Sequence, residues 1–179
     1  MGKILKWLLI VAVLLFGIFK FMQHRTKQAS PQTTAKMNKD GTEIEVSYSQ
    51  PSKKGREIFG GLVPYGEVWR TGANEATTFT TNKDLKIGGQ NLPKGTYTLW
   101  TIPNANQWSV ILNSGSYSWG VGFDSKASRD PKLDVVTVQV PVQLLPQSVE
   151  KFTISFATDS LPATMDLMWD KTKVSVPLQ

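Results

Sequence analysis

Apolar and polar residues alternate with a period of two over most of the chain after residue 36. Ile44, Val46 and Tyr48 alternate with polar neighbours, and the pattern recurs over residues 136–140 and 152–156. A period of two places alternate side chains on one face, so these segments predict half-buried β-strands. Further strands are predicted at Thr77–Thr81, 96–102 and 108–112.

Turn signals separate the predicted strands. Gly-Gly at residues 88–89 and Asn-Ala-Asn at 104–106 are typical of tight turns. Alternation over 165–169 resumes at 174–176 after Asp-Lys-Thr at 170–172, which predicts a closing hairpin. Roughly eight or nine short strands with one apolar face each need a second layer to cover them. The sequence therefore predicts an all-β fold, a β-sandwich of jelly-roll or immunoglobulin-like type, with a barrel as the alternative.

The N-terminal segment has a different pattern. Residues 7–19 form an uncharged run, "WLLIVAVLLFGIF", which as a helix spans only ~20 Å of the ~30 Å hydrocarbon core. Extension to residues 4–22 gives ~28 Å, because Lys6 and Lys20 can reach the interfaces. This pattern predicts a helix that crosses a lipid bilayer. A cleaved signal peptide is the alternative, but "KFMQHRTKQ" follows where small residues would mark a cleavage site.

Three parts follow from these patterns. Residues 1–27 form a signal-anchor with basic flanks, residues 28–35 a polar linker, and residues 36–179 the β-sandwich domain. Basic residues balance on the two sides of the apolar run, so charge does not fix the orientation in the membrane.

Charge and residue usage exclude several functions. The net charge is +6, but 5 of the 20 basic residues lie in the first 27 positions, which leaves 15 basic and 14 acidic residues elsewhere. A nucleic-acid binder would carry its excess charge on the folded domain, so we expect no nucleic-acid partner. There is no cysteine, and His24 is the only histidine. Cysteine or histidine metal sites and histidine-dependent triads are therefore excluded within one chain, and we expect no metal and no cofactor.

The candidate site lies in the segment "GREIFGGLVPYGEVWRTGANEATTFTT", residues 55–81. Arg70 offers a planar fork of donors for a carboxylate or phosphate. Asn74 and Glu75 can orient a ligand, and Tyr65 and Trp69 can supply an aromatic wall. Trp119, in the glycine-rich "GSYSWGVGF", is expected at the rim of the cleft. The candidate ligand-binding residues are Arg56, Tyr65, Trp69, Arg70, Asn74, Glu75 and Trp119.

Two alternatives use the same residues. In a purely structural envelope protein, Arg70 pairs with Glu67 or Glu75, and Asn74 closes a turn through its own backbone. A histidine-free glycoside hydrolase would use Glu75 with a second carboxylate such as Glu67 or Asp124. No spacing in the sequence places two carboxylates face to face, so a non-enzymatic binding or interaction module is our leading hypothesis.

Three blocks carry a family resemblance: "YSQPSKKGREIFGGLVPYGEVWRTGANEATTFT", "LPKGTYTLWTIPNANQWSVILN" and "SWG". From about Ser30 to the C terminus they resemble the bacterial family catalogued as domain of unknown function 2911. Members look like exported envelope proteins with an N-terminal signal. The resemblance implies a single-pass protein of the cytoplasmic (inner) membrane whose domain faces the periplasm or exterior, or a protein secreted after signal cleavage. It brings no catalytic residues, but it implies that Arg70, Asn74 and Glu75 belong to the family's signature block.

Overall fold

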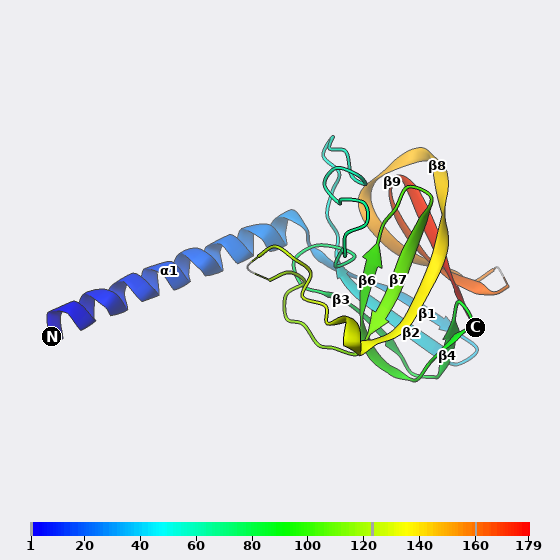
Figure 1. Cartoon of the computed structure of the whole chain (residues 1–179), viewed down its shortest axis with the longest axis horizontal. Helices are drawn as coiled ribbons and strands as arrows, with labels where there is room; N and C mark the ends of the chain where they lie inside the picture. The colour runs from blue at the N-terminus through cyan, green and yellow to red at the C-terminus, as the bar shows by residue number, and fades with distance from the viewer. Residues whose placement is uncertain (1, 123, 160) are drawn as a thin grey trace.

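The computed structural model describes residues 2–122, 124–159 and 161–179. Within them a helix, α1 (Gly2–Ala29), precedes a domain built of β-strands (Figure 1). The strands are β1 (Gln32–Lys39), β2 (Thr42–Ser49), β3 (Thr77–Thr81), β4 (Leu85–Ile87), β5 (Gln90–Leu92), β6 (Gly95–Ile102), β7 (Gln107–Asn113), β8 (Asp134–Ala157) and β9 (Ala163–Leu178), with a short 3-10 turn, η1 (Pro131–Leu133), before β8. The all-β prediction with one N-terminal helix is confirmed.

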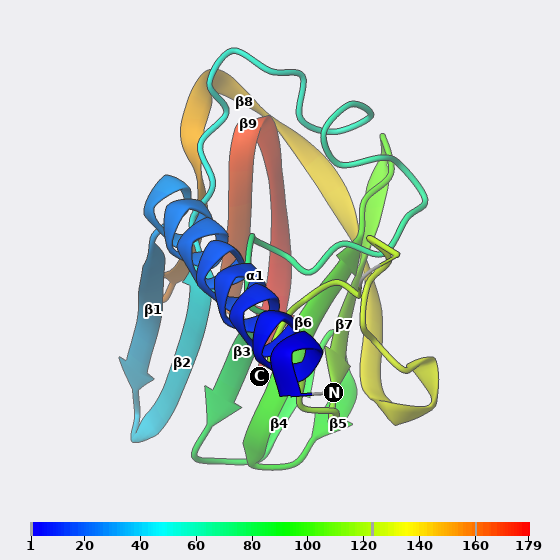
Figure 2. The same cartoon turned by 90° about the vertical axis from the view of Figure 1, so that its left-hand side faces the viewer.

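All strands pair antiparallel in the order β1-β2-β3-β6-β7-β8-β9-β4-β5. The 24-residue strand β8 serves both halves of this sheet, because its first part pairs with β7 and its second part with β9. The sheet turns over along β8, so β8 and β9 lie behind the layer that contains β1, β2, β3, β6 and β7 (Figure 2). The two layers enclose one core, as expected for a sandwich.

The alternating apolar positions of the sequence form this core. Ile44, Val46 and Val136 are at most 1% exposed, and Phe152 and Val176 are fully buried. Trp108 and Trp169 are the two tryptophans that alternation placed in the core, and each is 1% exposed. The period-two pattern therefore identified the inward face of several strands correctly.

The structure differs from the predicted element boundaries in two places. Residues 28–29 continue α1 and residues 32–35 belong to β1, so the expected polar linker 28–35 is mostly regular structure. The hairpin predicted across residues 170–172 is wrong, because β9 runs without reversal from Ala163 to Leu178. Asp170 instead sits at a register shift against β8, with a left-handed φ of 51°.

Polar side chains hold the irregular backbone at Asp170. One carboxylate oxygen of Asp170 accepts hydrogen bonds from Lys53 Nζ at 2.6 Å and from Ser148 Oγ at 2.7 Å. The bond from Lys53 is the main reason that the pKa of Asp170 lies below its ordinary value. Asp170 therefore links the bulged strands to the segment after β2, which leads into the candidate site.

Helix α1 extends away from the domain (Figure 1), and its apolar side chains are exposed. Residues Ile4–Ala29 have a peak mean hydropathy of 2.3, and none of that window is buried. A helix of this length and composition can cross a membrane or serve as a signal sequence. Its last turn reaches the domain at the loop that contains the candidate residues.

Candidate functional site

Trp69 fixes the candidate segment to the sheet. Its backbone N–H donates to the Thr101 carbonyl at 2.7 Å, and the Thr101 N–H donates back at 3.0 Å. Strand β3 pairs with β6 only as far as Leu99, so Trp69 takes the position beside the end of β6 that β3 leaves free. The residues around Trp69 are therefore held beside the end of β6, on the same side as β3.

The Trp69 ring joins the aromatic part of the core. It stacks on Trp169, with ring centroids 5.9 Å apart and an interplanar angle of 17°. It also meets Trp108 and Phe152 edge-on, at 6.2 and 4.9 Å. Its indole N–H donates to the Gly72 carbonyl at 3.1 Å, so the ring also orients the turn that follows it.

The turn from Arg70 to Glu75 has an unusual backbone. Thr71 and Asn74 have φ values of 54° and 59°, and Gly72 has 153°. A left-handed conformation is rare for a β-branched residue such as Thr71. The Thr71 carbonyl accepts a bond from Thr77 Oγ1 at 2.8 Å, and the Thr71 hydroxyl donates to Thr101 Oγ1 at 3.2 Å. Strained backbone of this kind persists where its surroundings hold it, often at functional sites.

Asn74 and Glu75 hold the end of α1. The Asn74 side chain is buried, and its amide donates to the carbonyls of Ser30 at 3.1 Å and Thr26 at 3.5 Å. Glu75 forms an ion pair with Lys27. The Thr26 carbonyl also accepts from the Ser30 N–H at 3.1 Å, so Asn74 contacts an acceptor that closes the last turn of the helix. The two residues therefore serve the helix junction, and neither the expected turn closure by Asn74 nor a pair between Arg70 and Glu75 is formed.

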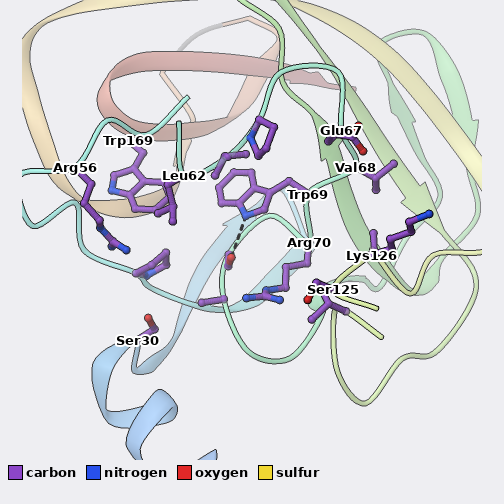
Figure 3. Close-up of a pocket in the computed structure, with 17 residues that line it drawn as sticks. Ser30, Arg56, Leu62, Glu67, Val68, Trp69, Arg70, Ser125, Lys126 and Trp169 are labelled. Atoms are coloured by element: carbon purple, nitrogen blue, oxygen red, sulfur yellow. Dashed lines mark hydrogen bonds between the residues drawn. The ribbon is translucent and has the colours of Figure 1, made fainter. Parts of the chain in front are cut away.

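A pocket of about 600 Å³ lies beside this turn (Figure 3). Of the candidate residues, Arg56, Trp69 and Arg70 line it, whereas Tyr65, Asn74, Glu75 and Trp119 do not. The rings of Trp69 and Trp169 form an apolar wall. The other lining residues that matter chemically are Ser30, Leu62, Glu67, Val68 and Lys126.

Arg70 is the distinctive group in this pocket. Its Nε atom is buried and has no hydrogen-bond partner among the described residues. Burial lowers the pKa of Arg70, but a guanidinium group stays protonated in proteins. The backbone of Gly120 lies against its aliphatic part so closely that a Cβ there would overlap Cβ and Cδ of Arg70. The loop after β7 therefore confines an unneutralised cation in the pocket wall.

The remaining candidate residues have other surroundings. Arg56 is exposed and donates to the backbone carbonyls of Ser52 at 2.7 Å and Lys53 at 3.0 Å. Tyr65 is 46% exposed and packs over the Gly60 backbone. Trp119 is half-buried in the loop after β7, outside the pocket lining.

Sequence patterns missed two lining residues that come from distant segments. Lys126 belongs to the loop after β7, which is joined to the candidate turn by a bond from the Gly120 N–H to the Asn74 carbonyl at 3.1 Å. Trp169 comes from β9, and alternation assigned it to the core only. The "SWG" block was the available signal, because its glycine is the residue that lies against Arg70.

The carboxylates do not form the arrangement that glycoside hydrolysis needs. Glu67 is the one acidic residue among the described residues that line the pocket, and Glu75 is paired with Lys27 outside it. Asp124 does not line the pocket. No group of three or more histidine, aspartate or glutamate side chains within the described part of the chain could hold a metal ion. The pocket lining therefore does not supply the two facing carboxylates that this chemistry needs.

Comparison with protein families agrees with the resemblance found in the sequence. The model for a protein of unknown function (DUF2911) matches residues 30–178. The chain belongs to this family. No curated protein and no solved structure matches it. The DUF2911 region begins at Ser30, directly after α1, and includes all of the pocket lining. Thr26 and Lys27, which bind Asn74 and Glu75, lie before it.

Proposed function

We propose that this chain is a single-pass membrane protein whose DUF2911 domain binds a small anionic ligand, without catalysis, outside the cytoplasmic membrane. The observation that carries the binding proposal is the buried, unpartnered Nε of Arg70 in the pocket wall. Arg70 as a whole is half-buried, and an anion in the pocket would supply the counter-charge that no acidic side chain of the described residues supplies. Arginine also offers two parallel donors, which suit a carboxylate or phosphate.

The rest of the pocket supports this ligand class. Its volume of about 600 Å³ lies in the range of small-molecule sites, ~300–1,000 Å³. Arg56, Arg70 and Lys126 line it against a single carboxylate, Glu67, among the described residues. The excess of cations favours an anion, and the half-buried indole of Trp69 with the exposed Leu62 favours an apolar body attached to it.

The docked end of α1 supports retention of the helix. Cleavage before Ser30 would remove the carbonyl of Thr26 and the ammonium group of Lys27. The buried Asn74 would keep its bond to Ser30 but lose the one to Thr26, and Glu75 would lose its ion-pair partner. The outward orientation of the domain rests on the resemblance to exported envelope proteins.

Thiol labelling tests the membrane arrangement, because the natural chain contains no cysteine. Lys94→Cys places one thiol on an exposed turn of the domain, and Gly2→Cys places one at the start of α1. We expect a membrane-impermeant maleimide to label Lys94→Cys in intact spheroplasts and Gly2→Cys only after lysis. The protein should fractionate with membranes, and mass spectrometry should find the peptide that contains residues 4–22. The reverse labelling pattern, or a mature N terminus near residue 30, would overturn the arrangement.

Arg70→Met tests the binding site. The substitution retains an apolar chain but removes the unpartnered charge, so the free energy of unfolding should stay equal or rise. Binding of the probes phenyl phosphate and benzoate should fall at least tenfold, measured by isothermal titration calorimetry on the full chain in uncharged micelles.

Arg129→Met is the matched control for this test. Arg129 also has a buried Nε without a hydrogen-bond partner, but its guanidinium pairs with Asp134 away from the pocket. This variant should lose stability, because Asp134 loses its cationic partner and keeps the bond from the Asn113 amide, and it should bind the probes normally. If Arg70→Met loses stability as Arg129→Met does and no probe binding depends on Arg70, the arginine is structural and the proposal fails.

A further inference from the structure

We propose that the ligand is an anionic amphiphile, a single apolar chain with a carboxylate or phosphate head, taken from the membrane surface at the root of α1. This inference rests on the proposed anion-binding function and names its ligand class. Three independent features of the pocket carry it: the position of its cations, its apolar wall and its distance from the apolar part of the helix.

Arg70 lies below the Trp69 ring, whereas Arg56 lies at the other end of the pocket lining, beside Trp169 (Figure 3). Figure 3 shows the guanidinium group of Arg70 below the Trp69 ring, pointing into the space that the lining residues surround. The half-buried guanidinium group of Arg70 marks where an anionic head gains most, because no acidic side chain of the described residues pairs with it. Lys126 also lines the pocket, but its exposed side chain points away from Arg70 (Figure 3), so Arg70 is the cation on which the head would depend.

The apolar wall is larger than an inorganic anion can use. Trp69 is half-buried and its ring stacks on the fully buried Trp169, while Leu62 and Val68 line the pocket beside it. Leu62 is 46% exposed although it is a large apolar side chain. A hydrophilic anion would leave these surfaces in water, whereas a hydrocarbon chain would cover them. Each methylene group that becomes buried raises affinity about fourfold.

The pocket lies next to the end of the membrane helix. Ser30 lines it, and Ser30 is separated from Met22, the end of the apolar segment, by about eight residues or ~12 Å of helix. The headgroup layer is ~5–8 Å thick on each side of the bilayer. An upright α1 therefore places the pocket just outside the headgroups, within reach of a molecule that leaves the leaflet. The bond from the Asn74 amide to the Ser30 carbonyl holds the pocket at this position.

Basic residues in the C-terminal half of α1 give an electrostatic reason to expect an anionic amphiphile as the ligand. Lys20 and Arg25 are exposed, and each lies over a phenylalanine ring of its own helix, at 5.6 and 5.9 Å. Lys27 is paired with Glu75, so the other two cations are available to lipids. Basic residues beside a membrane helix concentrate anionic amphiphiles at the surface. The helix would thus raise the local concentration of the molecules that the pocket takes.

A chain-length series tests the inference on the full chain in nanodiscs of zwitterionic lipid. The probes are butyl, hexyl and octyl phosphate, the carboxylates of equal chain length, and octyltrimethylammonium as the cationic control. All are used below their aggregation concentrations, and binding is followed by tryptophan fluorescence. We expect affinity to rise at least tenfold from the butyl to the octyl anion, with no binding of the cation. Arg70→Met should weaken the octyl anions at least tenfold, and Arg129→Met should leave them unchanged.

Leu62→Ser distinguishes the contribution of the ligand's apolar chain from that of its anionic head. Because Leu62 is largely exposed, this change should leave the fold intact and flatten the dependence on chain length while phenyl phosphate binding persists. A preference for phosphates would indicate a phospholipid-like source, and a preference for carboxylates a fatty-acid-like source; either supports the inference. If phenyl phosphate binds through Arg70 but affinity does not rise with chain length, the amphiphile inference fails and the proposed function survives. If no probe depends on Arg70, both fail.

Discussion

Trp69→Ala is expected to lower the free energy of unfolding by about 3–5 kcal/mol, the usual cost of removing a large buried aromatic side chain. The ring stacks on Trp169 and meets Trp108 and Phe152 edge-on, so its loss leaves a cavity between the two layers. The variant also loses the bond from the indole N–H to the Gly72 carbonyl, which orients the Arg70 turn. Denaturant unfolding of the full chain in micelles, followed by near-ultraviolet circular dichroism, measures the loss.

Two variants calibrate this result. Trp69→Phe keeps an aromatic ring and loses the hydrogen bond to Gly72, so it should cost much less than Trp69→Ala. Trp119→Ala removes a half-buried indole that makes no ring contact with the described residues, and should cost under about 1 kcal/mol. Equal losses for Trp69→Ala and Trp119→Ala would show that Trp69 is not part of the core.

Trp69 contributes both to the core and to the pocket, and no local sequence pattern predicts its contribution to the core. Trp108 and Trp169 lie on alternating strands, so their burial was predictable from the sequence. Trp69 lies in an irregular segment with no period, and its burial comes from pairing with Thr101 beyond the end of β3. Its contribution to both core and pocket is a tertiary property that the residues beside it do not encode.

The same distinction applies to the candidate site. Residue type alone identified Arg70, because a guanidinium among glycines and aromatic residues is chemically conspicuous. The partners of Asn74 and Glu75 were not predictable, because they lie on α1, more than forty residues earlier. Polar residues in a loop are interpreted by default as facing a ligand or one another. Here the fold divides them between a helix junction and a pocket.

The predicted start of the β domain at residue 36 and the predicted closing hairpin differ from the structure for related reasons. Strand β1 buries only Met37 among its eight residues, so it has no apolar alternation and resembles a polar linker. Asp-Lys-Thr at 170–172 has turn-forming composition, but Asp170 is bonded to Lys53 and Ser148 across a bulge. Composition indicates where the backbone departs from a regular strand, but not whether the chain then reverses.

Gly72→Ala is expected to have the second large effect on stability. Gly72 lies in the turn between the helix junction and the pocket. Gly72 has a φ of 153°, and a Cβ there would lie 2.9 Å from the Ser49 carbonyl oxygen and 3.2 Å from Thr77 Oγ1. Both neighbours belong to or border buried strands and cannot yield easily. We expect a loss of about 2–3 kcal/mol in the free energy of unfolding, from backbone strain and displacement together.

Gly66→Ala is the matched control, because Gly66 also has a positive φ, 76°, but a Cβ there meets nothing within 4 Å. It should cost only about 1 kcal/mol, the strain of a left-handed alanine. Gly72→Ala should also weaken phenyl phosphate binding at least tenfold, because the displaced turn carries Arg70 two residues upstream, whereas Gly66→Ala should bind normally. Similar losses of stability and affinity in both variants would mean that the close approach to Ser49 does not position Arg70. A loss confined to Gly72→Ala would establish that the strained turn, rather than loop flexibility in general, holds the arginine in the pocket wall.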